Sequence, residues 1–315
     1  MSATVEERPT PALTEPRKVA PAKDSRKLIR SQVRAGWLFL APALLHSGIF
    51  IVIPVVAAIV LSFTDYSFGD SWSWIGFANY SELFQDVDFR AALANTLLYA
   101  VVVVPLSMAI SLAVAIGLNQ KIKAIGFFRT AFYLPTVTAT VAIATIWLWI
   151  YNPGSGLANG FLSLFGFAPG RWLSDPSTAL PSLMVVGIWQ GLGTKIIIYL
   201  AALQGVSRDL MESASLDGAN RWQRFVNVTW PALGPVQFFV LVTSIVGTFQ
   251  VFDLVYVMTR GGPGTETHVL VLDIYQNAFQ ALRLGFASAE TVIMMLVIAI
   301  FIGLGRLLQK ADVND

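Results

Sequence analysis

Long apolar runs alternate with shorter polar segments along the whole of this chain. Six runs stand out, at roughly 35–63, 96–118, 127–150, 180–204, 233–257 and 288–307. Each is long enough to cross the hydrocarbon core of a bilayer, which takes about 20 residues at 1.5 Å per residue. Because a backbone inside lipid must satisfy its own hydrogen bonds, the pattern predicts an all-α, polytopic membrane protein with six transmembrane helices.

The polar N-terminus contrasts with the rest of the chain. Residues 1–33 are rich in Pro, Lys and Arg, which predicts a disordered cytoplasmic tail before a single transmembrane domain at 34–310. The apolar run that follows is too long for a signal-peptide core. Charged residues make up 13% of the sequence, against about a quarter in ordinary soluble domains, so a separate soluble core is not expected.

Basic residues are segregated between the loops. They gather before the first run, in the second and fourth connections and after the last run, whereas the odd-numbered connections are rich in acids. The positive-inside rule therefore predicts that both termini and the segment 205–232 face the cytoplasm. The basic residues that set this orientation are Arg17, Lys18, Lys23, Arg26, Lys27, Arg30, Arg34, Lys121, Lys123, Arg129, Arg208, Arg221, Arg224, Arg306 and Lys310.

The polar segment 205–232, here named the elbow, carries helix start and stop signals. Ser207 is an N-cap type of residue, and Gly218 suits the left-handed position that ends a helix. Asn220 and Gln223 then form a capping-box pattern. The signals predict two short helices with a sharp bend. Two interpretations remain open from the residues alone: a hairpin lying on the membrane surface, or a rigid surface that a partner protein grips.

Lys195 is the one residue whose charge lies deep inside a predicted span. A buried Lys in a membrane helix is costly, so it either faces a translocation cavity or partner subunit, or reaches a water-filled vestibule with its long side chain. Asp253 and Glu290 are expected near the outer ends of their spans, too far away to pair with Lys195. Gln250 is a second candidate for the substrate pathway.

Further polar residues in or near the spans have a simpler explanation than substrate contact. Interhelical hydrogen bonds account for such side chains in many membrane bundles. We expect this role, with substrate contact as the alternative, for Thr194, Thr243, Ser244, Thr248 and Gln250.

Catalytic and metal-binding constellations are missing from the sequence. There is no cysteine, and the two histidines, His46 and His268, lie far apart. No Walker A pattern or nucleophile with a paired base is present. We therefore expect a non-catalytic chain that holds no metal and no cofactor.

The elbow resembles the EAA motif of ABC importer permeases. Glu212, Ala214, Gly218 and Pro231 match at the expected spacing, while the departures are Ser213, Val228 and Trp230. Four further stretches are similar to MalF-like sugar permeases, so that the resemblance covers roughly 35–308. They are Leu61 to Tyr66, Asn95 and Thr96, Phe132 to Pro135, and Phe252 to Pro263.

The resemblance implies a MetI-like type I importer bundle in a bacterial or archaeal cell membrane. It implies coupling to an ATPase through Glu212, Ala214, Asp217 and Gly218. The implied partners are a second permease subunit, a cytoplasmic ATPase dimer that binds ATP and Mg²⁺, and an extracytoplasmic substrate-binding protein. The implied cargo is a carbohydrate, a di- or oligosaccharide, with glycerol 3-phosphate as the alternative. An ion-coupled secondary transporter is the alternative of a different class, although no acid is expected to pair with Lys195.

Overall fold

The computed structural model describes residues 23–67, 72–120 and 125–314. They divide into two compact units, residues 1–56 and 57–315. In the first unit, helix α1 (Lys23–Ser47) continues through a π-helical turn into α2 (Ile53–Leu61). The helix thus begins within the segment predicted as a disordered tail, and the earlier part of that tail lies outside the described residues. The basic residues Lys121 and Lys123 also lie outside them.

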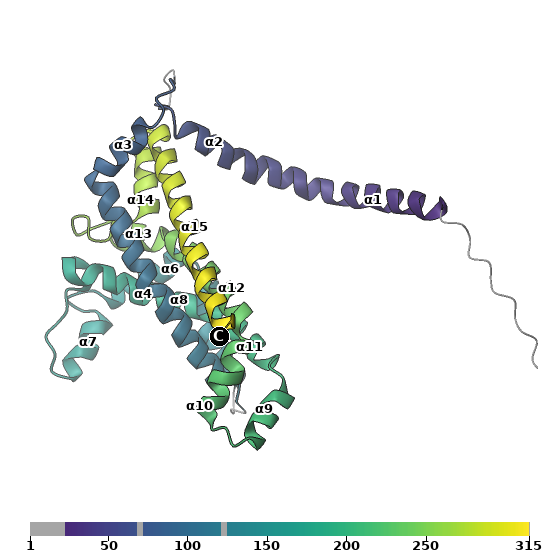
Figure 1. Cartoon of the computed structure of the whole chain (residues 1–315). Helices are drawn as coiled ribbons and strands as arrows, with labels where there is room; N and C mark the ends of the chain where they lie inside the picture. Colours follow the sequence, from purple (N-terminus) through teal and green to yellow (C-terminus); the bar gives the residue numbers. More distant parts are fainter. Residues whose placement is uncertain (1–22, 68–71, 121–124, 315) are drawn as a thin grey trace, which may run out of the picture. The chain divides into compact units, whose positions relative to one another are not determined.

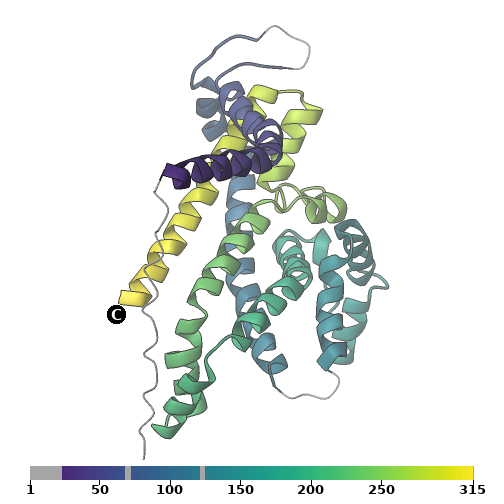
Figure 2. The same cartoon turned by 90° about the vertical axis from the view of Figure 1, so that its right-hand side faces the viewer.

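The second unit is a bundle of long helices (Figures 1 and 2). Helix α8 packs along α4, and α12 packs against both α4 and α15. The only β-type pairing in the described part of the chain is an isolated bridge between Thr64 and Trp74. The long helices are α4 (Val87–Leu118), α8 (Pro176–Gln204), α12 (Gly234–Phe249) and α15 (Leu284–Asn314).

The predicted spans correspond to helices, with one change of form. Among the described residues, five helical stretches are long and apolar enough to cross a membrane. A sixth is formed by α5 (Ile125–Val137) and α6 (Thr140–Ile150), which meet at an angle of 102°. Pro135 lies just before the bend and removes a backbone donor from the helix. Counting this pair as one span confirms the six-helix, all-α bundle.

Shorter elements connect the spans. Asp175 caps the start of α8, where hydrogen bonds from the side chain and backbone of Ser177 hold the pKa of Asp175 below its ordinary value. The short helices are α3 (Ala78–Gln85), α7 (Leu157–Leu164), α9 (Arg208–Leu216), α10 (Arg221–Arg224), α11 (Trp230–Ala232), α13 (Asp253–Met258) and α14 (Leu270–Tyr275).

Glycine permits a close helix contact between α5 and α8. A Cβ atom at Gly193 would collide with the Thr136 hydroxyl and the Phe132 carbonyl oxygen. The Thr136 hydroxyl in turn donates a hydrogen bond to the carbonyl oxygen of Gln190, at 2.9 Å. Small residues let membrane helices approach in this way, and here they hold the bent span against α8.

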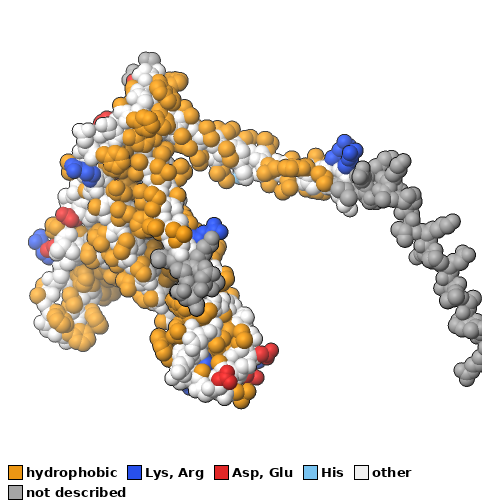
Figure 3. All heavy atoms as spheres, viewed as in Figure 1, with side chains coloured by type: hydrophobic (Ala, Val, Ile, Leu, Met, Phe, Trp, Pro, Cys, Tyr) orange, Lys and Arg blue, Asp and Glu red, His pale blue; other side chains and the backbone are white. Residues whose placement is uncertain are grey.

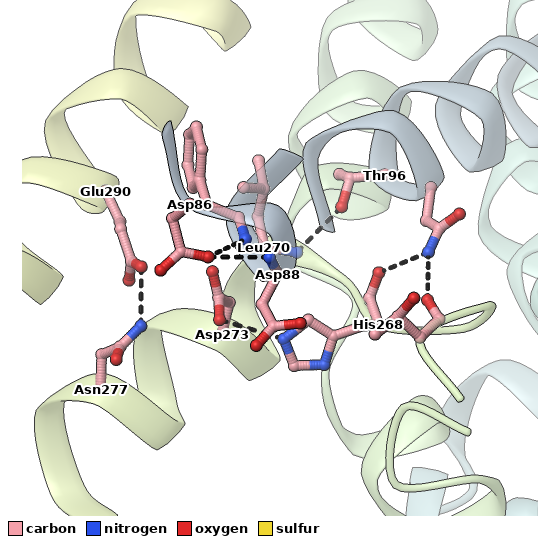
Figure 4. A network of polar contacts seen from close by, with 11 residues as sticks. Asp86, Asp88, Thr96, His268, Leu270, Asp273, Asn277 and Glu290 are labelled. Carbon is pink, nitrogen blue, oxygen red and sulfur yellow. Dashed lines mark hydrogen bonds and ion pairs between the residues drawn. The ribbon is translucent and has the colours of Figure 1, made fainter. Parts of the chain in front are cut away.

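A buried polar network joins α4, α14, α15 and the loop before α14 (Figure 4). The Thr96 hydroxyl accepts a hydrogen bond from the backbone N–H of Leu270, at 2.9 Å. His268 Nε2 and Asp273 Oδ1 are 3.0 Å apart. The Asn277 amide donates to Glu290 Oε1 at 2.8 Å. These contacts place α14 between two spans and so determine the shape of that end of the bundle.

Two carboxyl groups in the network are almost fully enclosed. Asp273 is 4% exposed and Glu290 is 0% exposed. No donor in the described part of the chain reaches Asp273 Oδ2 or Glu290 Oε2, and the two carboxyl groups lie close enough to interact with each other. A buried acceptor without a donor is costly. A donor introduced at the Glu290 position is therefore expected to be tolerated.

We predict that Glu290→Gln preserves the thermal stability of the assembled protein, whereas Glu290→Ala lowers its free energy of unfolding by about 2–4 kcal/mol. The glutamine oxygen keeps the contact with Asn277, and its amide replaces an oxygen that has no partner. Scanning fluorimetry of the protein in nanodiscs measures the unfolding temperature of each variant against the unchanged protein. Equal losses for the two variants would contradict this account of the network.

Candidate functional site

A polar cavity of about 420 Å³ lies among α4, α8, α12 and α13. Its wall combines amide, hydroxyl and charged groups with aromatic and aliphatic side chains. This mixture is typical of sites for polar organic solutes. The polar residues important for the argument are Gln190, Lys195, Thr243, Ser244, Gln250 and Asp253.

A break in the fifth span shapes one side of the cavity. Helix α12 ends at Phe249, and α13 starts at Asp253. The intervening residues Gln250 and Phe252 both line the cavity. Non-helical backbone is tolerated at membrane depth where it lines a cavity or is buried in protein. Because the helix is interrupted here, Gln250 and Phe252 both reach the cavity wall.

Lys195 and Gln250, the two predicted pathway residues, line this same cavity. Lys195 Nζ donates a hydrogen bond to the Gly191 carbonyl oxygen, at 3.2 Å. The side chain therefore turns toward the start of α8 and away from the elbow, the direction that helical geometry favours.

Lys195 and Asp253 both line the cavity. The broken span begins a new helix at Asp253. No ion pair between them is found in the described part of the chain. The cavity wall thus carries one basic side chain, Lys195, and one acidic side chain, Asp253.

The prediction that Thr243 and Thr248 make interhelical hydrogen bonds is wrong. Their hydroxyls donate to carbonyl oxygens of their own helix, at Phe239 and Ser244 respectively, both at 2.9 Å. A threonine one turn from a helical carbonyl satisfies itself locally. The Ser244 hydroxyl is buried and has no hydrogen-bond partner in the described part of the chain.

Sequence analysis missed Gln190, which makes an interhelical contact at the cavity. Its amide donates to the Thr140 hydroxyl on α6, at 3.0 Å. An amide in the middle of an apolar run was the available signal. The contact joins the bent span to the cavity wall, so that movement of one would displace the other.

Two glycines shape the cavity wall. A Cβ atom at Gly247 would meet nothing within 4 Å, so this position on α12 opens into space. A Cβ atom at Gly187 on α8 would collide with the hydroxyl of Tyr99 on α4. Gly187 therefore permits Tyr99 to lie against α8 at the cavity.

An aromatic cluster continues from the cavity wall. The rings of Phe252 and Tyr256 are stacked with centroids 5.2 Å apart, and Tyr275 lies 5.2 Å from Phe252. Phe252 lines the cavity itself. Flat aromatic faces beside hydrogen-bonding side chains suit solutes that have both apolar and hydroxyl-bearing surfaces.

The elbow has the predicted bend. Gly218 adopts φ +80°, in the left-handed region. The Ala219 N–H donates to the Ala214 carbonyl oxygen at 3.0 Å, and the Gly218 N–H donates to the Ser215 carbonyl oxygen at 3.1 Å. These two bonds form a complete Schellman motif. The end of α9 is therefore held in one conformation.

The second helix of the elbow begins with the predicted capping box. The Asn220 side chain accepts from the Gln223 N–H at 2.9 Å, and the Gln223 side chain accepts from the Asn220 N–H at 2.8 Å. Ser207 occupies the N-cap of α9 but makes no side-chain capping bond. The bend thus depends on local hydrogen bonds on both of its sides.

The predicted coupling residues lie on the elbow's surface. Glu212, Asp217 and Gly218 are exposed, and Ala214 is half-buried. Acidic side chains are visible on the elbow in Figure 3. Leu216 is 89% exposed. These side chains are therefore accessible from outside the permease chain.

Two helices connect the elbow to the cavity. Helix α8 lines the cavity and ends just before the elbow, and α12 starts just after the elbow and lines the cavity again. Tyr199, Leu203 and Leu233 belong to one buried cluster at this junction. Close packing makes such a junction move as a unit.

Comparison with known proteins agrees with this arrangement. Residues 107–311 match the family described as "binding-protein-dependent transport system inner membrane component". The chain belongs to this family. It is therefore a permease subunit, and the six-helix bundle and the elbow confirm the predicted type I importer architecture.

The relatives include permease proteins named for sugar and for sn-glycerol-3-phosphate transport systems. The permease is 34% identical over 269 residues to AmyD of Thermoanaerobacterium thermosulfurigenes, a probable starch degradation products transport system permease protein, covering 84% of this chain and 90% of AmyD. It is 32% identical over 274 residues to UgpA of Pectobacterium atrosepticum, an sn-glycerol-3-phosphate transport system permease protein, covering 85% and 92%.

A solved structure shows the same fold. It is that of a bacterial alginate ABC transporter in complex with an alginate pentasaccharide-bound periplasmic protein. The TM-score is 0.75 at 26% identity, covering 87% of this chain and 94% of that one.

We predict that Gly187→Ala destabilises the permease by about 1–3 kcal/mol, because the new methyl group overpacks the site against the Tyr99 hydroxyl. Removing that hydroxyl in the double variant Gly187→Ala, Tyr99→Phe is expected to restore most of the loss. Thermal unfolding of the single and double variants measures the coupling. Additive losses would contradict the contact.

Proposed function

We propose that this permease is one of two membrane subunits of an ATP-driven importer that moves a di- or oligosaccharide into the cytoplasm by alternating access. The single observation that carries the proposal is the connection of a polar cavity to a rigid, exposed elbow through α8 and α12. The cavity can hold a solute, and the elbow can be moved by a partner protein that binds it.

The elbow supports the coupling role of Glu212, Ala214, Asp217 and Gly218. A cytoplasmic ATPase that closes around ATP must move the permease through a surface that does not itself deform. The Schellman motif and the capping box supply that stiffness. Rigid-body rocking of packed helices then transmits the movement to the cavity.

The cavity supports a carbohydrate as the solute. Gln190, Gln250 and the Ser244 hydroxyl provide neutral hydrogen-bonding groups, and Phe252 provides an aromatic face. The relatives' names agree with such a cargo, since AmyD is described as a permease for starch degradation products. We assign Lys195 and Gln250 to the pathway of the sugar, with Gln250 as a hydrogen-bonding contact and Lys195 on the cavity wall without direct contact to a neutral sugar.

The remaining components follow from the same proposal. ATP and Mg²⁺ bind to a separate cytoplasmic ATPase dimer, and this chain holds no cofactor. A second permease subunit completes the pathway as a heterodimer, and an extracytoplasmic binding protein delivers the sugar. The alginate transporter with its periplasmic protein supports this composition. Both termini and the elbow face the cytoplasm of a bacterial or archaeal cell.

Glycerol 3-phosphate is the second candidate cargo. The observations that favour it are Lys195 on the cavity wall and the similarity to UgpA. Asp253 on the same wall would repel a phosphate and so favours the neutral sugar. Membership of a binding-protein-dependent family argues against the third alternative, an ion-coupled secondary transporter.

The coupling role predicts that Gly218→Leu lowers sugar uptake by about tenfold or more while membrane insertion and assembly remain, because an L-residue other than Asn or Asp pays about 1–2 kcal/mol in the left-handed conformation. Gly218→Asn is the matched control and should retain most uptake. Space does not limit either variant, since nothing lies within 4 Å of the missing Cβ.

Uptake and ATP hydrolysis are both measured in proteoliposomes that contain the complete transporter. ATP hydrolysis that continues in Gly218→Leu without uptake supports the coupling role. Normal uptake in Gly218→Leu would refute it.

The cargo is tested by Lys195→Met and Gln250→Ala in the same proteoliposomes. For a neutral sugar, we expect Gln250→Ala to lower the uptake rate by about fivefold or more, because a lost hydrogen bond in a dry site costs about 1 kcal/mol or more. Lys195→Met should change it by less than about twofold. A larger loss of uptake in Lys195→Met than in Gln250→Ala, measured with glycerol 3-phosphate as the solute, would favour the phosphate cargo.

A further inference from the structure

The short helix α7 has the opposite amphipathicity to that of a soluble surface helix. Its apolar side chains Leu157, Phe161 and Leu164 are 60%, 62% and 79% exposed. Phe165, at the end of the helix, is 63% exposed. The positions 157, 161, 164 and 165 share one helical face. Figure 3 shows hydrophobic side chains gathered over α7.

The polar side of α7 faces the protein. Asn159 is 9% exposed, and its amide donates to the carbonyl oxygens of Pro153 and Gly170, at 2.9 and 3.0 Å. Its side-chain oxygen accepts from the Gly170 N–H and from Trp172 Nε1, both at 2.8 Å. All of these bonds would break if the helix rotated to bury its apolar face. The exposed orientation is therefore built into the loop.

Composition indicates what covers the apolar face. No Asp, Glu, Lys or Arg occurs between residues 152 and 170. Protein interfaces usually have a polar, charged rim, and contacts between membrane helices use small residues for close approach. This face instead consists of Leu and Phe.

A neighbouring aromatic residue points to the same occupant. Trp149, near the end of α6, is 63% exposed. Trp and Tyr concentrate where a protein meets the membrane–water boundary. The uncharged apolar face of α7 is therefore continuous with a stretch of chain that has the composition of a lipid-contacting segment.

We propose that α7 is a membrane-inserted helix that buries Leu157, Phe161, Leu164 and Phe165 in lipid, in addition to the six spans. The inserted leaflet is the one opposite the elbow, because α8 leads from this loop to the elbow. Only the span assignment is needed for this proposal, and neither the cargo nor the coupling role enters it. Burial of the face stabilises α7 against the bundle and anchors the end of α8 that bears the cavity wall.

The absence of cysteine from the chain makes the test direct. Phe161→Cys places a single thiol on the apolar face, and Ser163→Cys places one on a different face of the same helix as the matched control. Both positions are exposed. Phe161→Cys removes a ring contact with Phe165, and Ser163→Cys removes a hydrogen bond to the Gly160 carbonyl oxygen, both of them within α7 or at its end. The complete transporter carrying either thiol, with any cysteine of its other subunits replaced, is labelled with bimane and reconstituted into vesicles that contain phospholipids spin-labelled on the acyl chain.

We expect the label at position 161 to be quenched by these lipids at least about twofold more strongly than the label at position 163. Equal quenching at the two positions would overturn the proposal. So would emission at position 161 that is insensitive to the spin-labelled lipids, or that responds only when the binding protein is added, which would identify a protein docking surface. Retained uptake in both labelled variants confirms that the transporter is folded.

Discussion

Satisfaction of backbone hydrogen bonds in the absence of water is the constraint on which the rest of this structure depends. Continuous helices meet it along most of the spans. Where the third and fifth spans break, at 138–139 and 250–252, the chain lies beside the polar cavity or a neighbouring helix. Near the first break, the Thr136 hydroxyl donates to the Gln190 carbonyl oxygen, and the Gln190 amide donates to the Thr140 hydroxyl. The second break lies on the cavity wall, so that the site forms where the fifth span is interrupted.

Local hydrogen bonds give the elbow its stiffness. Free carbonyl groups at the end of a helix allow it to fray. The Gly218 turn satisfies two of them at the end of α9, and the Asn220–Gln223 pair satisfies backbone N–H groups at the start of α10. A segment that makes its own hydrogen bonds resists fraying. The buried cluster around Tyr199 and Leu233 then joins it to the helices of the cavity.

Local features were predicted well because they depend on neighbours in sequence. The turn at Gly218 and the capping box at Asn220 were predicted from residues three or four positions apart. The spans were predicted from continuous apolar runs. Contacts that depend on distant residues were not. The Thr243 and Thr248 hydroxyls donate to carbonyl oxygens of their own helix instead of to a neighbouring helix. The Gln190 amide on α8 donates to the Thr140 hydroxyl on α6, a contact that was not predicted. Hydrophobic periodicity carries no information on which helix face meets which neighbour.

The sequence by itself determined the number of spans, the place of the bend in the elbow and the family, because length, apolar character and spacing are properties of the chain alone. Only the tertiary structure brought Lys195, Gln250 and Asp253 to one cavity and turned the apolar face of α7 outward. The physical reason is that these arrangements arise from the packing of helices far apart in sequence and from a helix break that apolar composition does not reveal. Asn159 illustrates this, since a single buried amide with partners at Pro153, Gly170 and Trp172 decides which side of its helix is exposed.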